Sequence, residues 1–387
     1  MHQGRMVFSQ VMDYFPVRDF QSIVARYEGD KWVQSFTCRS HFNAMAFAQF
    51  TGRASLRDIA TCLATNARHL HHMGIQSSVS RNNLAHANET RDWRIYRDVA
   101  MLLINRARQL CAGEEIDVDL KNAIYAFDST TVELCLTLFP WANFRRTKAG
   151  IKMHTSVDVR GNIPSFIRIT DAKQHDVNAL DDLPLEPGAY YLVDRGYLDF
   201  RRLHTVHAAG AFFVTRTKRN TRFRRQYSRP VDKASGLRSD HTGVLCGVKA
   251  PDQYPDPLRR VTFRDPETGK RLCFLTNSMS ITALDVCRLY KLRWQVELFF
   301  KWIKQHLRIK HFVGTSLNAV HVQIWVAIAT YTLVAIMVKE LSIRKSMYDV
   351  LQFLNVSIFE KALITEVFSD TVALSEPESA FIQQEFL

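Results

Sequence analysis

The feature that most constrains the fold is a change of hydrophobic period near residue 120. Before this point apolar residues recur at helical spacing, and after it they alternate as in β-strands. The turn Arg160-Gly161-Asn162 separates two alternating runs and predicts a hairpin. In chain order, the predicted elements are a strand over 122–128, hairpin strands over 151–159 and 164–170, a short helical segment from 176, a strand over 189–194, a helix over 199–208 and a strand over 211–216.

This element order indicates an α/β fold with a mixed sheet. Three antiparallel strands followed by alternating strands and helices are the order of a ribonuclease-H-like catalytic core. Turn clusters and short β-like runs interrupt this order and predict a β-rich insertion, after which helices resume at Ile281. The expected domains are a helical DNA-binding domain (1–115), the first part of the core (116–216), the insertion (217–280), the second part of the core (281–340) and a C-terminal helical region with an acidic tail (341–387).

The N-terminal region predicts several short helices. The apolar run from His41 to Phe50 precedes Thr51-Gly52, a typical helix end, and Ser55 with Asp58 resembles a capping box that opens the next helix. Short helices joined by a turn suit a helix-turn-helix-like DNA-binding unit. A helical bundle with a solvated basic face fits the same spacing equally well, so both interpretations stand.

Net charge indicates a polyanionic partner. The chain has 387 residues, with 51 Lys and Arg against 38 Asp and Glu, a net charge of +13. Nucleic acid is the commonest partner for such a balance. Seven cysteines without a C-x-x-C pair argue against a disulfide framework or a structural zinc site and favour the cytoplasm. No signal peptide is expected, and the apolar stretch Ile324–Val338 is shorter than the roughly 20 residues of a membrane span, which predicts a buried core helix.

Two aspartates are predicted to end strands. Asp128 follows the apolar run 124–127, and Asp194 follows 189–193. A carboxylate at a strand end projects from a rigid support into a cleft. Taken singly, each aspartate is more often a simple turn former.

The segment from Tyr290 to Leu307 predicts an amphipathic helix. At about 100° per residue, one stripe carries Tyr290, Arg293, Glu297, Lys301 and Lys304, and the roughly opposite stripe carries Leu292, Val296, Phe299, Ile303 and Leu307. The helix then packs by its apolar stripe and presents a carboxylate flanked by cations. A salt-bridged surface helix explains the same pattern, because Arg293 and Glu297 are an i,i+4 pair.

Phosphodiester chemistry requires this combination of groups. Two Mg²⁺ ions roughly 3.5–4 Å apart clamp the attacking and leaving oxygens, and hard cations prefer carboxylate oxygens. Asp128, Asp194 and Glu297 are therefore the candidate metal ligands, and Lys or Arg one or two helical turns from the glutamate can bind DNA phosphates.

The chain resembles the bacterial insertion-sequence transposases of the DDE class. The motifs are Asp194-Arg195-Gly196-Tyr197, the segment 126–131, Phe139-Pro140-Trp141 and the Tyr290/Arg293/Glu297/Lys304 spacing, which matches the branch with a Tyr-Arg-Glu-Lys signature. The resemblance implies that Asp128, Asp194 and Glu297 are catalytic and hold two Mg²⁺ or Mn²⁺ ions, while Tyr290, Arg293 and Lys304 contact phosphates. It also implies a dimeric synaptic complex on double-stranded element ends and target DNA, in the nucleoid-associated cytoplasm and without a membrane.

The implied function is binding of terminal inverted repeats with cut-and-paste cleavage and strand transfer. Related enzymes pass through a DNA hairpin and stack a flipped base on a tryptophan of the insertion. This chain has no tryptophan between Trp141 and Trp294, which leaves Phe223, Tyr227 and Tyr254 as candidates or places the contact elsewhere. Two alternatives remain open, a domesticated nuclease without strand transfer and a non-catalytic DNA-binding regulator.

Further basic residues are candidate DNA contacts. Residues 216–229 contain seven Lys and Arg and no acids, interleaved with Phe223 and Tyr227, a composition typical of strand-contacting surfaces or of a solvated loop. The full set of expected DNA contacts is Tyr290, Arg293, Lys301, Lys304, Arg145, Arg146, Lys148, Arg195, Arg222, Arg224 and Arg225. Near the expected cleft, His154 is predicted to be a core histidine, and Asp176 is predicted to cap a helix rather than to reach the metal site.

Overall fold

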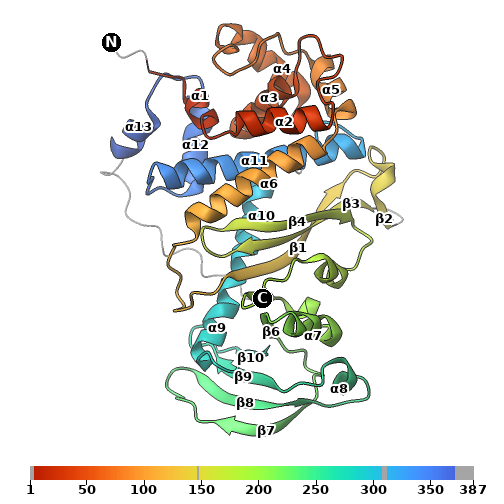
Figure 1. Cartoon of the computed structure of the whole chain (residues 1–387), viewed down its shortest axis with the longest axis vertical. Coiled ribbons are helices and arrows are strands. Elements are labelled where there is room, and N and C mark those ends of the chain that lie inside the picture. The colour runs from red at the N-terminus through yellow and green to blue at the C-terminus, as the bar shows by residue number, and fades with distance from the viewer. Residues whose placement is uncertain (1–3, 146–147, 307–311, 371–387) are drawn as a thin grey trace.

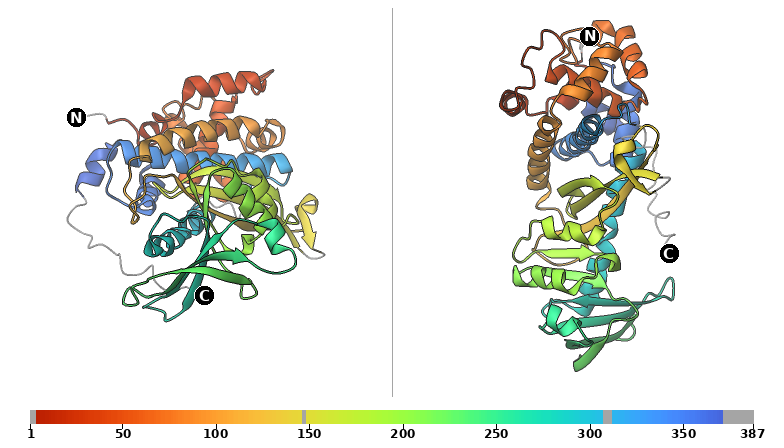
Figure 2. Two further views of the ribbon diagram at one scale, coloured as in Figure 1. Left: turned by 60° about the horizontal axis from the view of Figure 1, so that its bottom comes forward. Right: turned by 90° about the vertical axis from the view of Figure 1, so that its right-hand side faces the viewer.

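The computed structural model describes residues 4–145, 148–306 and 312–370. Helices from both ends of the chain form one end of the molecule, and strands of the insertion form the other (Figure 1; Figure 2, right). The N-terminal helices are α1 Val7–Met12, α2 Val17–Arg26, α3 Cys38–Phe50, α4 Leu56–Thr65, η1 Ala67–His69, α5 Arg81–Thr90 and α6 Arg94–Cys111. After the insertion, α9 Ala283–Leu292 lies beside β10, and α10 Trp294–His306 leads from it toward the helical end (Figure 1). The helices α11 Leu317–Glu340, α12 Met347–Ser357 and α13 Ile364–Asp370 lie at that end with the N-terminal helices.

One ten-stranded sheet runs through the molecule in the order β2-β3-β1-β5-β6-β10-β9-β8-β7, with β4 paired to β3. Its strands are β1 Ile124–Leu134, β2 Asn143–Arg145, β3 Lys148–Asp158, β4 Ile163–Asp171, β5 Tyr190–Val193, β6 Phe212–Arg216, β7 Phe223–Arg229, β8 Leu237–Leu245, β9 Leu258–Arg264 and β10 Arg271–Thr276. Short helices η2 Pro140–Ala142, η3 Asp176–Asp182, η4 Arg195–Tyr197, α7 Phe200–Ala208 and α8 Ala250–Gln253 connect them.

The strand order β4-β3-β1-β5-β6 is that of a ribonuclease-H-like core. Strand β3 pairs antiparallel with both β1 and β4, whereas β5 is parallel to β1 and β6 is parallel to β5. The predicted fold class is therefore confirmed. The strands of the insertion do not form a separate sheet, because β10 pairs with β6 and β9, β8 and β7 follow it in the same sheet.

Alternating side chains bury both faces of the central strands. Ile124 and Ala126 of β1 belong to the large core cluster beneath the helices, whereas Tyr125 and Phe127 belong to a second cluster with α7 on the opposite face. A sheet covered on both faces needs apolar residues at every position of its central strands, which explains the continuous apolar run before Asp128.

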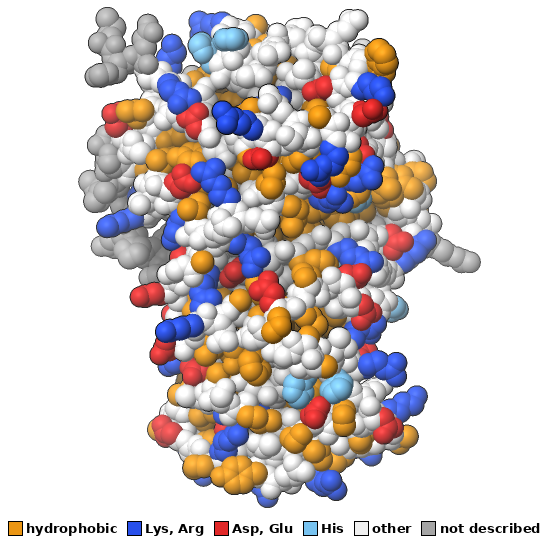
Figure 3. Space-filling model, in the orientation of Figure 1, with side chains coloured by type: hydrophobic (Ala, Val, Ile, Leu, Met, Phe, Trp, Pro, Cys, Tyr) orange, Lys and Arg blue, Asp and Glu red, His pale blue; other side chains and the backbone are white. Residues whose placement is uncertain are grey.

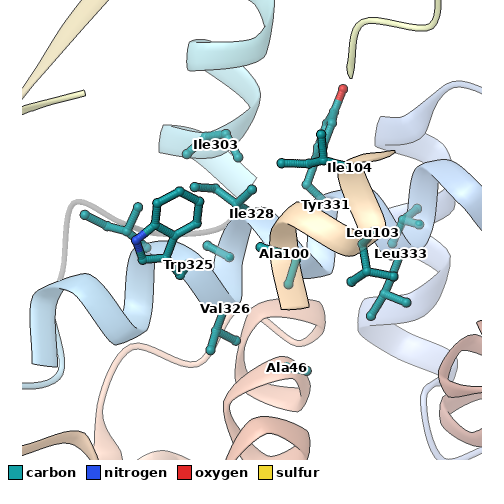
Figure 4. Packing of buried hydrophobic residues seen from close by; sticks show 14 of the residues in the cluster. Ala46, Ala100, Leu103, Ile104, Ile303, Trp325, Val326, Ile328, Tyr331 and Leu333 are labelled. Atoms are coloured by element: carbon teal, nitrogen blue, oxygen red, sulfur yellow. The ribbon is translucent and has the colours of Figure 1, made fainter. Parts of the chain in front are cut away.

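Helix α11 is the centre of the larger core. It is long and apolar enough to cross a membrane, but 89% of its apolar window is buried inside the protein, so the prediction of a buried core helix is confirmed. Figure 4 shows Val326 and Ile328 of α11 among Ile303, Ala100 and Ala46, which come from α10, α6 and α3. This packing fixes α10 against the sheet and so fixes the helix that carries Glu297.

Candidate active site

Two aspartates lie side by side at one edge of the parallel strand pair. The last register partners of β1 and β5 are Phe127 and Val193, so Asp128 and Asp194 are the next residue of each strand. Both have even numbers, like Ala126 and Leu192, whose side chains face the large helical core. Strand geometry therefore directs both carboxylates to the face that α9 and α10 cover.

Asp128 does not end its strand, contrary to the prediction. Strand β1 continues to Leu134 because β3 pairs with it as far as the partners Leu134 and Ala149. Only the pairing with β5 ends at Phe127. The cleft therefore opens where β5 stops beside a longer strand.

Glu297 approaches the aspartates from the helical side. The predicted continuous helix is divided at Arg293, between α9 and α10, where the amides of Arg293 and Val296 bond carbonyls three residues earlier instead of four. Even so, Tyr290, Arg293, Glu297, Lys301 and Lys304 line the same pocket as Asp128 and Asp194. On the other stripe Val296, Phe299 and Ile303 are fully buried and Leu292 is half-buried, while Leu307 lies outside the described residues.

Arg293 connects two of the three acids. Its guanidinium donates to Asp128 Oδ2 over 3.3 Å and to Glu297 Oε1 over 2.6 Å. The Tyr290 hydroxyl donates to Asp194 Oδ1 over 3.1 Å, and the amide of Gly196 donates to the other oxygen of the same carboxylate over 3.1 Å. The Ser129 amide and the Tyr197 hydroxyl also donate to Asp128 Oδ1, so the site is a network of carboxylates held by one guanidinium, two phenols and two backbone amides.

The two aspartates have opposite pKa shifts. Burial raises the pKa of Asp128 to about 6, although the Ser129 amide and the charge of Arg293 favour its ionised form. Burial also opposes ionisation of Asp194, but the Gly196 amide and the Arg293 charge outweigh it and lower the pKa of Asp194. Burial raises the pKa of Tyr290 to about 12, so its hydroxyl remains a donor at neutral pH.

The donor chemistry of the pocket suits hard divalent cations. Three carboxylates line it, and Mg²⁺ and Mn²⁺ prefer oxygen ligands. Within the described ranges, no group of three or more His, Cys, Asp or Glu is arranged around a metal position. The Arg293 guanidinium lies against Asp128 and Glu297.

Several cations line the pocket beside the acids, and the sequence pattern missed one of them. Arg195, Lys301 and Lys304 were expected to contact DNA, and Arg216 opens the basic run 216–229; all four line the pocket. Lys270, which lies before β10, lines it as well. Lys270 had no recognisable signal, because it reaches the pocket only through the pairing of β10 with β6.

Two residues near Asp128 illustrate a wrong and a correct prediction. Asp176 does not cap a helix, since His175 holds the N-cap position of η3 without a side-chain bond. Instead its carboxylate accepts from Ser129 Oγ over 2.7 Å and pairs with Lys152 over 2.9 Å. His154 is a fully buried core histidine as predicted, and burial lowers its pKa to about 4.

The basic candidates on and beside β7 lie away from the pocket. Arg222, Arg224 and Arg225 are exposed on and beside the edge strand β7, at the end of the molecule opposite the N-terminal helices (Figure 1). Of Arg145 and Lys148 only the backbone is described, in β2 and β3, and Arg146 lies outside the described residues. Figure 3 shows Lys and Arg spread along the whole length of one face rather than gathered in one patch.

The aromatic candidates of the insertion differ in accessibility. Tyr254 is buried against His207, to whose Nδ1 its hydroxyl bonds over 2.8 Å, and Phe223 is half-buried beneath Arg260. Tyr227 is 60% exposed, so of these three it alone offers a free ring face.

Comparisons with known proteins place the chain among transposases. A family model described as a transposase DDE domain matches residues 120–333, and one described as a domain of unknown function matches residues 3–76. A putative transposase of Sinorhizobium fredii, y4zB, is 33% identical over 67% of this chain and 72% of its own. A probable transposase for insertion sequence element IS5377 of Geobacillus stearothermophilus is 31% identical over 53% of this chain and 54% of its own.

More distant proteins are similar over larger parts of the chain. A putative transposase for insertion sequence element IS4SA of Synechocystis is 22% identical over 73% of this chain and 79% of its own. A solved piggyBac transposase synaptic complex with hairpin DNA covers 94% of this chain and 80% of its own, with 10% identity and a TM-score of 0.46. The family match spans the core sheet and the helix of Glu297. This chain therefore belongs to the bacterial insertion-sequence transposases with a DDE domain, which are metal-dependent DNA nucleases.

Proposed function

We propose that this transposase binds the terminal inverted repeats of an insertion sequence and catalyses two-metal cleavage and strand transfer at Asp128, Asp194 and Glu297. The observation that carries the proposal is the convergence of the three carboxylates on one pocket, from β1, β5 and α10. Each acid stands on a rigid element, which catalytic geometry requires.

Divalent cations, Mg²⁺ or Mn²⁺, would be held by the three carboxylates. When bound, two such ions polarise the scissile phosphate and lower the pKa of the attacking hydroxyl. The protein's own contribution is orientation. Tyr290 and Gly196 hold Asp194, and Lys304 is fixed to β1 through a 3.0 Å bond to the carbonyl of Thr131.

Phosphate contacts are assigned to the cations around the acids. Arg293, Lys301 and Lys304 come from α10 and its junction with α9, Arg216 comes from the end of β6, and Lys270 comes from the insertion. A DNA strand in the pocket would therefore meet positive charge from several elements. Tyr290 would add a contact from α9. The proposed DNA contacts further include Arg195, which lines the pocket, and the basic residues Arg145, Arg146, Lys148, Arg222, Arg224 and Arg225.

The larger organisation follows from this assignment. Residues 1–115 are proposed as the end-recognising helical domain, 116–216 and 281–340 as the catalytic core, 217–280 as its insertion and 341–387 as a C-terminal helical region. Paired element ends require two active sites, so we propose a homodimer in the synaptic complex, working in the cytoplasm on nucleoid DNA. Membership of the Tyr-Arg-Glu-Lys branch rests on the spacing of Tyr290, Arg293, Glu297 and Lys304.

The test is cleavage of a labelled duplex that carries the inverted repeats flanking the gene. We expect cleavage at the repeat boundary in the presence of Mg²⁺. No cleavage is expected when EDTA is present or when the duplex sequence is scrambled. A pre-cut end with a free 3′-hydroxyl then measures joining to target DNA separately. Cleavage without joining would favour the nuclease alternative, and repeat binding without either reaction would favour the regulator.

A further inference from the structure

One cation pairs with two of the proposed metal ligands. The Arg293 guanidinium lies between Asp128 and Glu297, bonded to one carboxylate through each terminal nitrogen. Its side chain is only 12% exposed, against 21% for Asp128 and 31% for Glu297. Little water screens this arrangement, so the pairing is stronger than that of a surface ion pair.

The backbone and neighbouring side chains hold Arg293 in this position. It forms the junction between α9 and α10, and its guanidinium carbon lies 5.7 Å from the centre of the Tyr290 ring. Its Nε is buried without a hydrogen-bond partner among the described residues. The guanidinium is thus bound through both terminal nitrogens, while its Nε–H has no acceptor among the described residues.

A DNA phosphate offers what this position lacks. A guanidinium binds phosphate in a bidentate manner, with Nε and a terminal nitrogen donating side by side. Leaving Nε unbonded in the interior is costly, so a phosphate that accepts from it provides a favourable alternative partner. Arg293 therefore has two competing sets of anions, the two carboxylates or a phosphate.

We propose that Arg293 is a latch that keeps Asp128 and Glu297 from taking up metal ions until DNA phosphate draws its guanidinium away. The inference rests on the proposed function, in which these acids are the metal ligands. A divalent cation and the guanidinium need the same carboxylate oxygens and cannot both have them. Metal loading and DNA binding are then coupled, and by linkage each strengthens the other.

The latch would give the enzyme a safeguard against unspecific cutting. In the absence of DNA, only molecules with an open latch bind metal ions. The apparent metal affinity is then the affinity of the open state multiplied by the fraction of molecules in which the latch is open. A latch closed in about nine of ten molecules weakens binding about tenfold, and one closed in 99 of 100 about a hundredfold. The nuclease centre is then assembled mainly on DNA.

The experiment measures Mn²⁺ binding to the DNA-free full-length protein by the electron paramagnetic resonance signal of free Mn²⁺. Arg293→Gln removes the latch, and Arg293→Lys keeps the charge but replaces the planar guanidinium fork with a single ammonium nitrogen. Both variants are expected to bind Mn²⁺ at least about tenfold more tightly than the wild type. Lys301→Gln, which removes a charge from the same pocket without touching the bridge, is the matched control and is expected to change affinity less than about threefold.

Unchanged Mn²⁺ affinity in both Arg293 variants would overturn the latch. An increase in Mn²⁺ affinity in Lys301→Gln equal to that in the Arg293 variants would also overturn it, because the loss of any positive charge in the pocket would then explain the effect. A short duplex of the flanking inverted repeat adds a second arm. It should tighten Mn²⁺ binding in the wild type and leave Arg293→Gln unchanged. The double variant Arg293→Gln/Asp128→Asn separates the two proposals: continued tight Mn²⁺ binding would show that Asp128 is no ligand, which refutes the metal site itself.

Discussion

Asp128 and Asp194 are neighbours because Phe127 and Val193, the residues before them, are the last register partners of the parallel strands β1 and β5. Their positions are therefore fixed by the hydrogen bonds of the sheet and by its alternation, not by flexible loops. Glu297 is positioned independently, by the packing of Val296, Phe299 and Ile303 into the helical core. The site therefore joins two rigid parts of the molecule.

Tyr290→Phe should weaken catalysis with little effect on the fold. The ring remains packed 4.9 Å from Phe274, but the hydroxyl that donates to Asp194 is lost. We expect the free energy of unfolding to change by about 1 kcal/mol or less and end cleavage to slow roughly tenfold, as for a group that orients a catalytic residue. A cleavage rate equal to that of the wild type at saturating DNA would contradict this role.

Arg224→Gln/Arg225→Gln should weaken DNA binding uniformly across sequences. If each side chain neutralises one phosphate, the slope of log affinity against log salt concentration falls by about 1.8. The measurement is fluorescence anisotropy of a labelled duplex across salt concentrations. The matched control, Arg224→Lys/Arg225→Lys, retains both charges and should keep the slope; no change in the glutamine variant would exclude β7 from the DNA interface.

Ile328→Ala should destabilise the protein by about 2–5 kcal/mol, because this fully buried side chain of α11 leaves a cavity that its neighbours cannot fill. Urea unfolding measures the change. Val356→Ala removes a comparable apolar side chain that is 78% exposed and should stay within about 0.5 kcal/mol of the wild type. Equal effects of the two substitutions would contradict the assigned core.

Stability should fall as the pH is lowered from about 6.5 to 4. Burial lowers the pKa of His321 to about 4, so the unfolded chain takes up a proton at a pH where the folded protein does not. A histidine whose pKa is lower in the folded protein than in the unfolded chain contributes its full stability above the unfolded pKa of about 6.5. That contribution is lost as the pH falls from this value toward the folded pKa. His154, with the same value, acts in the same direction.

His321→Phe isolates one of these protons. The ring can still stack on Trp93, whose centre lies 4.5 Å away, but it no longer titrates. Between pH 6.5 and 4 the free energy of unfolding should then fall less steeply, by up to ~1.4 kcal/mol per pH unit. His71→Phe, at an exposed position, serves as the control, and identical slopes in wild type and His321→Phe would refute the assignment.

The sequence predicted the local elements of the core well, because their period and turns are local properties. The hairpin around Gly161, whose φ is +73°, and the buried character of α11 required no tertiary information. The length of β1 was missed because its second half, after the apolar run, is stabilised by pairing with β3. A polar strand segment with a partner on one side resembles a loop in sequence.

Site residues that a motif or a helical stripe identified in the sequence line one pocket, as Glu297 and Lys301 do. Features that depend on distant pairing could not be predicted. Lys270 reaches the pocket only through the register of the insertion strands, and the bond from Ser129 to Asp176 joins residues 47 positions apart. The bridge from Arg293 to Asp128 spans 165 positions, whereas its i,i+4 partner Glu297 was evident from spacing.

The most direct measurement compares the wild type with Asp128→Asn, Asp194→Asn and Glu297→Gln for Mg²⁺-dependent cleavage of the flanking inverted repeat, alongside its binding. These substitutions keep the size of each side chain while removing a charged ligand. Each variant is expected to bind the repeat as the wild type does, or more tightly, and to lose cleavage by at least about a thousandfold. Retention of near wild-type cleavage by any one of the three would contradict the assignment of a shared metal-dependent active site.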